Sequence, residues 1–315
     1  MTAPKTILIA GGSGLIGRSL SKSLRESGHS VLILTRNPKS ESDVFWNPYL
    51  GKIDNNKVKD VQVIINLIGE GIAEQKWTFK RKKELTESRV IPTRFLAEIA
   101  LELKQLDYYV GASGINCYGF DSDELVTEDA PYGSDYLSLL VKDWENASDL
   151  FLAKCPVVKL RIASVLTNDG GLIEKFKVPL FFRCAPVFGN GNQLMSWIHL
   201  SDLCRLINFC IDGQISGTFN AVSNNDSGYS FAKMLLKTSK KWGFIFKIPS
   251  WVIRFAFGEM SIILLRGIKA SNQKIRDAGF TFSFNTIFCF VLLVLRLLLL
   301  SYSTYYALLC KHLVR

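Results

Sequence analysis

Residues 5–36 read KTILIAGGSGLIGRSLSKSLRESGHSVLILTR, and this stretch decides the fold. A short apolar run from Ile7 leads into the glycine turn of residues 11–17, a helical pattern follows to Glu26, and a second apolar run covers residues 31–34. The predicted order is strand, glycine turn, helix, strand. This is the β-α-β unit that opens a dinucleotide-binding sheet.

Each glycine of the turn has an expected role. Gly11 permits the tight turn that leaves the strand, Gly14 lets the backbone approach a pyrophosphate, and Gly17 lets the helix pack closely on the sheet. The phosphates are expected at the helix N-terminus. The alternative is a glycine turn with a purely structural role, and the strand and helix on its two sides make that interpretation the weaker one.

The end of the second apolar run predicts which cofactor binds. Thr35, Arg36 and Asn37 stand there, Lys39 follows, and no acidic residue comes before Glu41. An acidic residue at this place binds the unphosphorylated ribose of NAD, whereas a 2′-phosphate needs a cation and hydroxyl groups. Because a guanidinium grips a phosphate through two hydrogen bonds, we expect NADP, with Arg36 as the discriminating residue. The alternative is a solvated arginine at a strand end.

Length and composition fit a globular α/β protein. The chain has 315 residues, 48% hydrophobic and 21% charged, and its formal charge is +10. Anionic small molecules are therefore plausible ligands, but the basic residues are dispersed except at 76–83, which we interpret as a solvated helix face, so no nucleic-acid partner is expected. The cysteines are odd in number and form no C-x-x-C pair, so neither a metal site nor a disulfide framework is expected; they are 117, 155, 184, 204, 210, 289 and 310.

The start of the chain, MTAPKTILIA, runs straight into the first predicted strand. It has neither a charged-then-apolar leader nor an arginine-rich presequence. We therefore expect an intracellular, soluble protein, most simply a cytoplasmic one, with a mitochondrial location or a membrane anchor at the other end left open.

Further apolar runs alternate with helical patterns, which predicts an α/β protein with a Rossmann-type, doubly wound parallel sheet of about seven strands. Leu67 and Ile68 follow one buried run and are expected against the adenosine or nicotinamide ribose, because ligands bind at the carboxyl edge of such sheets. Pro92 is expected to break or start a helix. The remaining strands are expected at 44–46, 61–67, 108–113, 157–162 and 217–222, and the helices over most of 74–104 and at 137–153 and 202–212.

The expected domain organisation follows from where this alternation stops. Residues 1–165 are predicted to form the NADP-binding domain, completed by 200–222. Residues 166–199 and 223–285 interrupt the rhythm and are predicted to form a small substrate lobe.

Several segments together resemble an atypical, epimerase-like branch of the short-chain dehydrogenase/reductases, known as epimerase family proteins. They include GGSGLIG (11–17), NLIGEGIAEQKWTFKRKKELTESR (66–89), TEDAPYGSDYLSLLVKDWE (127–145), SWIHLSDL (196–203), FGEM (257–260) and AGFTFSF (278–284). The resemblance implies NADP contacts from Gly11, Ser13, Gly14, Leu15, Ile16, Gly17, Thr35, Arg36, Leu67, Ile68, Glu84, Arg89 and Val165. It also implies pairing of two copies through helices on the flank of the sheet.

The resemblance is less clear about the chemistry. Catalytic members of the superfamily use a tyrosine with a lysine four residues on, but Tyr136, in the helix where that pair is expected, has Leu140 at the fourth position after it. Ser113 falls where the superfamily places the helper hydroxyl, with a turn-capping role as the alternative, and Tyr118 is a candidate surrogate acid, with a structural role favoured. His199 is interpreted as a packing and capping residue.

Two functions follow from this pattern. The first is NADP-dependent hydride transfer on an unidentified small carbonyl or hydroxyl compound, with Ser113 orienting the substrate. The second is a non-catalytic NADP(H)-binding sensor or scaffold that lacks the Tyr-x-x-x-Lys pair at Tyr136.

The tail, residues 286–315, departs from the family pattern. Thirteen of the fourteen residues from Ile287 to Leu300 are apolar, so a helix here would be apolar on every side. A membrane contact is expected only through residues 287–310, although Arg296 lies near the middle of the run. The alternative is a variant C-terminus that packs partly on the lobe, and the residues do not decide between the two.

Overall fold

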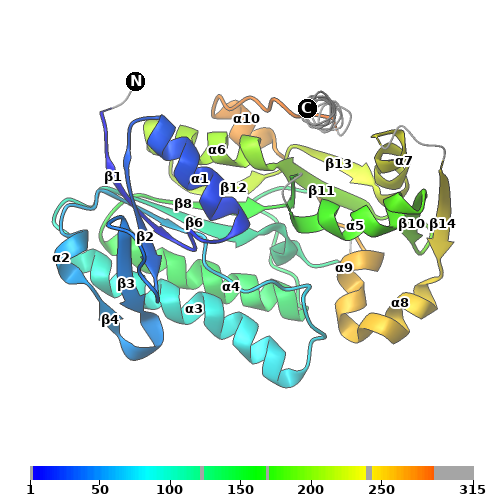
Figure 1. Cartoon of the computed structure of the whole chain (residues 1–315), viewed down its shortest axis with the longest axis horizontal. Coiled ribbons are helices and arrows are strands. Elements are labelled where there is room, and N and C mark those ends of the chain that lie inside the picture. The colour runs from blue at the N-terminus through cyan, green and yellow to red at the C-terminus, as the bar shows by residue number, and fades with distance from the viewer. Residues whose placement is uncertain (1–2, 121–123, 168–169, 239–242, 287–315) are drawn as a thin grey trace, which may run out of the picture.

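The computed structural model describes residues 3–120, 124–167, 170–238 and 243–286, and its centre is one eight-stranded sheet (Figure 1). The strands of this sheet are β1 (Thr6–Ala10), β2 (Ser30–Thr35), β3 (Asp43–Asn47), β4 (Lys52–Ile53), β5 (Val63–Asn66), β6 (Tyr108–Gly114), β8 (Val157–Ile162) and β12 (Gly217–Ala221). Their order is β12-β8-β6-β5-β1-β2-β3-β4, and all pair in parallel except β3 with β4. The predicted doubly wound parallel sheet is confirmed.

The eighth strand, β4, is the difference from the predicted count. It lies between the strands predicted at 44–46 and 61–67, where no strand was expected. The side chain of Asn47 accepts a hydrogen bond from the Tyr49 backbone and caps the short 3-10 helix η1 (Pro48–Leu50), and Gly51 adopts a left-handed φ of +60°. Because this tight turn reverses the chain, residues 52–53 pair back onto β3.

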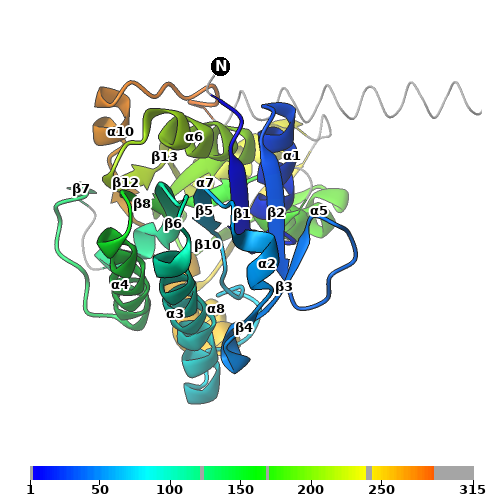
Figure 2. The same ribbon diagram turned by 90° about the vertical axis from the view of Figure 1, so that its left-hand side faces the viewer.

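Helices cover both faces of the sheet (Figure 2). One face carries α1 (Leu15–Glu26), α6 (Leu200–Gly213) and α10 (Gln273–Asp277). The other face carries α2 (Asn55–Val58), α3 (Phe79–Glu102) and α4 (Tyr136–Asp149). The 3-10 helices η2 (Ile115–Tyr118) and η3 (Leu150–Ala153) contact α4. Alternate residues of β1 pack into the helix layers on opposite faces of the sheet. Ile7 and Ile9 pack toward α1 and α6, and Leu8 and Ala10 pack toward α3. The sheet is thus buried on both sides.

Helix α3 runs through Pro92, so the expected break does not occur. Residues on both sides of this proline, among them Leu85 and Leu96, are fully buried. Their burial offsets the lost backbone hydrogen bond, which costs about 3 kcal/mol in a helix interior.

Smaller elements form a lobe beyond the carboxyl edge of the large sheet (Figure 1). Its strands are β9 (Ser164–Leu166), β11 (Leu194–His199) and β13 (Asn224–Ser227) in one sheet, β10 (Cys184–Phe188) with β14 (Phe244–Ile248), and β7 (Leu125–Val126) with β15 (Lys269–Ala270). Its helices are α5 (Gly171–Phe181), α7 (Gly228–Thr238), α8 (Ser250–Phe257), η4 (Gly258–Ser261) and α9 (Ile262–Leu265). Trp197, Phe176 and Phe231 lie at the centre of its core.

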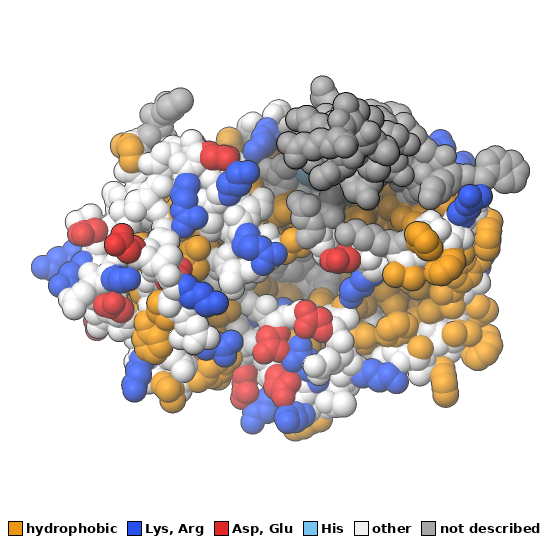
Figure 3. All heavy atoms as spheres, viewed as in Figure 1, with side chains coloured by type: hydrophobic (Ala, Val, Ile, Leu, Met, Phe, Trp, Pro, Cys, Tyr) orange, Lys and Arg blue, Asp and Glu red, His pale blue; other side chains and the backbone are white. Residues whose placement is uncertain are grey.

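The outer surface of the lobe is rich in exposed apolar side chains (Figure 3). They come from α5 and its end (Val178, Phe181, Phe182), from β14 (Phe244, Phe246) and from α8 (Trp251, Phe255). No helix in the described part of the chain is both long and apolar enough to cross a bilayer. The apolar run predicted in the tail lies outside the described residues.

Candidate functional site

The glycine turn connects β1 to α1 at the point where the strand order reverses. Gly11 has a φ of +83°, and a Cβ added to it would lie 2.9 Å from the carbonyl carbon of Leu67. A Cβ on Gly17 would lie 2.3 Å from the carbonyl oxygen of Gly11. The tight turn at Gly11 and the close packing at Gly17 are therefore as predicted, because neither position has room for a side chain.

Gly14 is the N-cap of α1 and makes no side-chain cap, and the first turn of this helix holds no acidic residue. The N–H groups at the N-terminus of α1 therefore have no capping side chain, and no carboxylate in the first turn competes with a bound anion. Arg18 donates a hydrogen bond of 2.6 Å to the carbonyl oxygen of Ser13, which ties the turn to the helix that follows it. This geometry fits a phosphate at the helix N-terminus.

A cavity of about 370 Å³ lies over this turn. The ends of three parallel strands contribute its walls: β2 through residues 34–37, β5 through residues 67–70, and β3 through Trp46 and the following Pro48 and Tyr49. Seven of the residues predicted to bind a cofactor line it together, namely Gly11, Ser13, Gly14, Thr35, Arg36, Leu67 and Ile68. Leu15, Ile16 and Gly17 belong to the first turn of α1 and are not among the lining residues.

Arg36 supplies the positive charge of this cavity. Its side chain is exposed, and within the described residues no hydrogen bond or ion pair engages its guanidinium. Its charge acts on the neighbouring Tyr49, where it opposes the rise in pKa that burial causes. The acidic residue in the lining, Glu70, is paired with Arg81. The cavity therefore presents a free cation beside the end of β2.

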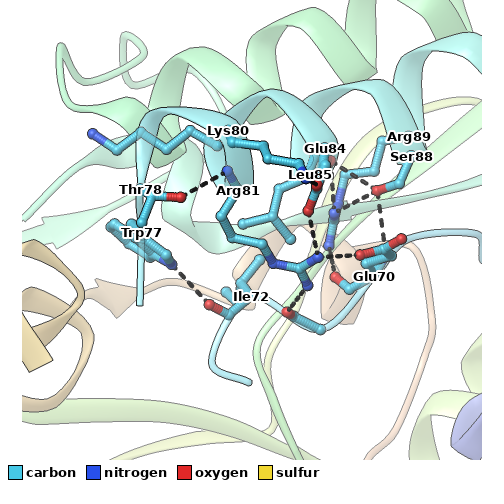
Figure 4. A network of polar contacts seen from close by, with 12 residues as sticks. Glu70, Ile72, Trp77, Thr78, Lys80, Arg81, Glu84, Leu85, Ser88 and Arg89 are labelled. Carbon is cyan, nitrogen blue, oxygen red and sulfur yellow. Dashed lines mark hydrogen bonds and ion pairs between the residues drawn. The ribbon is translucent and has the colours of Figure 1, made fainter. Parts of the chain in front are cut away.

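The loop after β5 is fastened to α3 by several side chains (Figure 4). Arg89 donates hydrogen bonds to the carbonyl oxygens of Glu70, at 2.7 Å, and Leu85, at 2.9 Å. Arg81 pairs with the Glu70 carboxylate and donates to the Gly71 carbonyl oxygen at 3.2 Å. These contacts fix the backbone that forms one wall of the cavity.

Glu84 and Arg89, expected at the cofactor, do not line the cavity, whereas Ser88 between them does. Glu84 pairs with Arg81 at 3.3 Å. Arg89 is 8% exposed and lies over the ring of Trp144, and burial lowers its pKa to about 10. Its observed hydrogen bonds go to the carbonyl oxygens of Leu85 and Glu70 and to the Ser88 hydroxyl, so its direct contact with a cofactor stays a prediction.

Val165 lines a second cavity, of about 730 Å³, between the sheet edge and the lobe. Residues 67–70 border the first cavity and residues 71–74 border the second, so one continuous segment leads from one to the other. Leu15 lies near this junction, because a Cβ on Gly171, in the second cavity, would be 3.3 Å from its Cδ2. Sequence-predicted residues thus occur at both cavities.

The two predicted catalytic residues meet in one buried network. The Ser113 hydroxyl donates to Oε1 of Glu145 at 2.5 Å, and the Tyr118 hydroxyl donates to Oδ1 of Asn220 at 2.7 Å. Arg161 joins the two halves, since it bonds Glu145 at 2.9 Å and donates to the Tyr118 oxygen at 3.0 Å. Neither Ser113 nor Tyr118 lines either cavity, and their catalytic roles stay predictions.

Electrostatics in this network favour a neutral phenol and a charged ion pair. Burial raises the pKa of Tyr118 well above its usual value, although the charge of Arg161 opposes the rise. Burial alone would also raise the pKa of Glu145, but the hydrogen bonds and charge of Arg161 outweigh it and hold that pKa below the usual range. Tyr118 therefore lacks the lowered pKa that a neighbouring lysine gives an active tyrosine.

His199 is the N-cap of α6. Its Nδ1 accepts a hydrogen bond of 3.1 Å from the Ser201 backbone, and its ring stacks on Phe284 with centroids 3.9 Å apart. Burial lowers its pKa to about 4, although the charge of Asp202 opposes the shift. The packing and capping interpretation is confirmed.

Tyr49, Trp46 and Ser88 line the first cavity but were not predicted from the sequence. The positions of Tyr49 and Trp46 could have been predicted from the sequence. Residues 44–46 are expected as a strand of the parallel sheet, and the residues that follow it must reach the same carboxyl edge as the glycine turn. Ser88 had no comparable signal, because its position depends on how α3 crosses the sheet.

Comparison with known proteins agrees with this geometry. Residues 7–138 match the family model described as the NAD dependent epimerase/dehydratase family, and residues 248–289 match a domain of unknown function, DUF1731. An epimerase family protein of Mycobacterium leprae is 33% identical over 291 residues, which cover 89% of this chain and 92% of that protein. This chain belongs to the epimerase family.

Other relatives in the epimerase family extend the comparison to solved structures. The epimerase family protein SDR39U1 of Mus musculus is 30% identical over 285 residues, 88% of this chain and 95% of the relative. A crystal structure of human SDR39U1, isoform 2, with NADPH is 25% identical and superposes with a TM-score of 0.82 over 92% of this chain and 99% of that one. The fold is the NAD(P)-binding Rossmann fold of the short-chain dehydrogenase/reductase type, as the sequence resemblance implied.

Proposed function

We propose that this protein binds NADP(H) in the first cavity and transfers a hydride to or from a carbonyl or hydroxyl group of a small molecule held in the second. The observation that carries the proposal is the single cavity shared by the uncapped N-terminus of α1, the free Arg36 and the end of β5 at Leu67. The first element suits a pyrophosphate and the second suits a 2′-phosphate.

The preference for the phosphorylated cofactor rests on charge. An acidic side chain at the end of β2 would repel a 2′-phosphate, and this chain has Thr35, Arg36 and Asn37 there instead. The human relative named above was solved with NADPH, which supports the same choice.

The second cavity is the candidate place for the reaction, because the segment 67–74 leads to it from the dinucleotide cavity. When bound, the nicotinamide supplies or accepts the hydride. Among the chain's own residues, Asn116 lines this cavity from η2, which follows β6, two residues before Tyr118. Ser113 and Tyr118 remain the candidate partners of the reacting oxygen.

A non-catalytic NADP(H)-binding sensor or scaffold is the second candidate function. The observation that favours it is the network around Glu145, which engages the hydroxyls of both Ser113 and Tyr118 away from the cavities. Tyr136 has no lysine four residues on, and Tyr229 and Lys233, which have that spacing on α7, do not line the second cavity. No activated phenol therefore lies among the described residues that line this cavity.

Titration of the purified protein with NADPH and NADH, followed by fluorescence, tests the proposed cofactor. Arg36→Ala is expected to weaken NADPH binding about 10- to 100-fold, the loss of a charge-assisted hydrogen-bonding partner, and to leave NADH binding unchanged. Lys39→Ala is the matched control, because Lys39 is an exposed cation that does not line the cavity. Equal or stronger binding of NADH to the parent protein would refute the preference for NADP.

Turnover separates the two candidate functions. A panel of carbonyl compounds with NADPH is expected to show oxidation of the cofactor by the parent, and a loss of rate in Ser113→Ala and Tyr118→Phe at unchanged NADPH affinity. No turnover of any member by a parent that binds NADPH would favour the sensor or scaffold.

A further inference from the structure

We infer that the second cavity takes an amphipathic substrate, with an apolar body, a hydroxyl group and an anionic end, rather than a sugar nucleotide. The inference rests on the proposed function, because it names the substrate class for the same site. It depends on the side chains that line the cavity, on one buried oxygen without a partner and on one free cation.

The interior of the cavity is mostly apolar. Its walls include Ile115 after β6, Phe176 on α5, Val187 and Phe188 on β10, Met195 on β11 and Ile263 on α9. At about 730 Å³ it is about twice the volume of the dinucleotide cavity and is within the range of sites that hold drug-sized ligands. Burying an apolar chain here gains free energy with each methylene, whereas burying a diphosphate without partners costs free energy.

The charged residues of the lining lie at its exposed rim. Glu74, Glu174, Lys175 and Arg266 are all exposed. Lys175 donates to the carbonyl oxygen of Ala73 at 3.4 Å, whereas the guanidinium of Arg266 makes no hydrogen bond or ion pair with the described residues. Arg266 is therefore available to an anionic group whose apolar body lies inside.

Gln193 offers a hydrogen-bond acceptor within the lining. Its Nε2 donates to the carbonyl oxygens of Phe188, at 3.1 Å, and Leu264, at 2.9 Å, which fixes the orientation of the amide. Its Oε1 is buried and has no hydrogen-bond partner among the described residues. A buried acceptor without a donor is unfavourable, so a ligand hydroxyl that reaches it as the neighbouring side chains move aside removes that cost.

The outside of the lobe is apolar as well. The elements α5 and β10 line the cavity and continue into the exposed surface of Phe181, Phe182, Phe244 and Trp251 (Figure 3).

Competition for a fluorescent probe tests the inference without the nicotinamide cofactor. The probe is 1-anilinonaphthalene-8-sulfonate, which joins an apolar body to an anion. The probe fluorescence that is present in the parent protein and lost in Ile263→Asp is assigned to probe bound in the cavity. Leu152→Asp is the matched control, because Leu152 is exposed on η3 and does not line the cavity. The competitors are straight-chain 2-hydroxycarboxylic acids with six to twelve carbons, the unsubstituted acids and the 1,2-diols of the same lengths, and UDP-glucose.

We expect affinity to rise about fourfold with each methylene, the factor that corresponds to burial of one CH₂ group. The 2-hydroxy acids are expected to bind more tightly than the unsubstituted acids, and Arg266→Gln to weaken the acids more than the diols. UDP-glucose is expected to leave the probe in place. A flat chain-length series, displacement by UDP-glucose, or an equal effect of Ile263→Asp and Leu152→Asp would overturn the inference.

Titration of the same samples with NADPH keeps the two proposals apart. A rising series in a protein that fails to bind NADPH would support the amphipathic cavity and refute the proposed cofactor. Affinities that do not change with chain length, in a protein that binds NADPH, would support the proposed cofactor and refute the amphipathic cavity.

Discussion

The hydroxyl of Ser113 donates a hydrogen bond of 2.5 Å to Oε1 of Glu145, 32 residues further along the chain. Glu145 is 1% exposed, and Arg161 bonds both of its carboxylate oxygens, at 2.9 and 3.1 Å. The predicted helper hydroxyl is thus held by a buried ion pair that links α4 to β8. Its orientation depends on residues that the sequence pattern does not connect with it.

Glu145→Gln is expected to lower the free energy of unfolding by about 3–5 kcal/mol, because it leaves the buried Arg161 without a counter-charge. Urea denaturation measures the change. The control is Asp149→Asn on the same helix, where the pair with Lys159 is partly exposed and is worth less than about 1 kcal/mol. Similar losses in both variants would show that the buried pair has no special importance for stability.

Substitutions in the glycine turn separate folding from binding. Gly17→Ala is expected to destabilise the fold by about 1–3 kcal/mol or more, because its Cβ would lie 2.3 Å from the Gly11 carbonyl oxygen. Gly14→Ala places its Cβ 3.3 Å from that same oxygen and is expected to cost about 1 kcal/mol or less. It is nevertheless expected to weaken NADPH binding at least tenfold, since the methyl group stands where the pyrophosphate approaches. Thermal unfolding and NADPH titration of both variants check this, and unchanged NADPH affinity in Gly14→Ala would contradict it.

Arg89→Met tests whether the hydrogen bonds from Arg89 that fix the loop after β5 are needed for cofactor binding. The variant keeps an apolar stem over Trp144 but loses the hydrogen bonds to Glu70 and Leu85, so we expect a loss of about 1–3 kcal/mol in stability. NADPH affinity is expected to fall as well, because residues 69–70 form a cavity wall. Arg94→Met is the control, as Arg94 is exposed on the same helix. Wild-type NADPH affinity in Arg89→Met would limit this arginine to a structural role.

The lowered pKa of His199 leads us to expect a loss of stability in acid. Its pKa in the folded protein is about 4, below the ordinary value of 6.5, so the unfolded chain takes up the proton first as the pH falls. The contribution is complete above pH 6.5 and is lost between about pH 6.5 and 4, with a size on the order of 3 kcal/mol. His199→Asn keeps an acceptor at the N-cap of α6 and removes the titration. We expect its unfolding free energy to vary less over this range; an unchanged slope would assign the acid sensitivity to other groups.

The sequence by itself determined the sheet and the edge at which the first cavity lies. Apolar runs such as residues 61–67 indicate strands buried on both faces, and the turn from Gly11 to Gly17 requires glycine for reasons that are local to the backbone. Parallel strands end at one edge, so the sequence predicts that Arg36 and Leu67 lie at the same edge of the sheet.

Tertiary structure alone decided which side chains face that edge. Arg89 turns to the loop at Glu70, Ser113 binds Glu145, and Tyr49 reaches the cavity from the end of β3. The physical reason is that periodicity fixes the face of an element that is buried, whereas a contact between two distant side chains depends on how helices cross the sheet and on what neutralises a buried charge. These long-range choices are not encoded in any local pattern of residues.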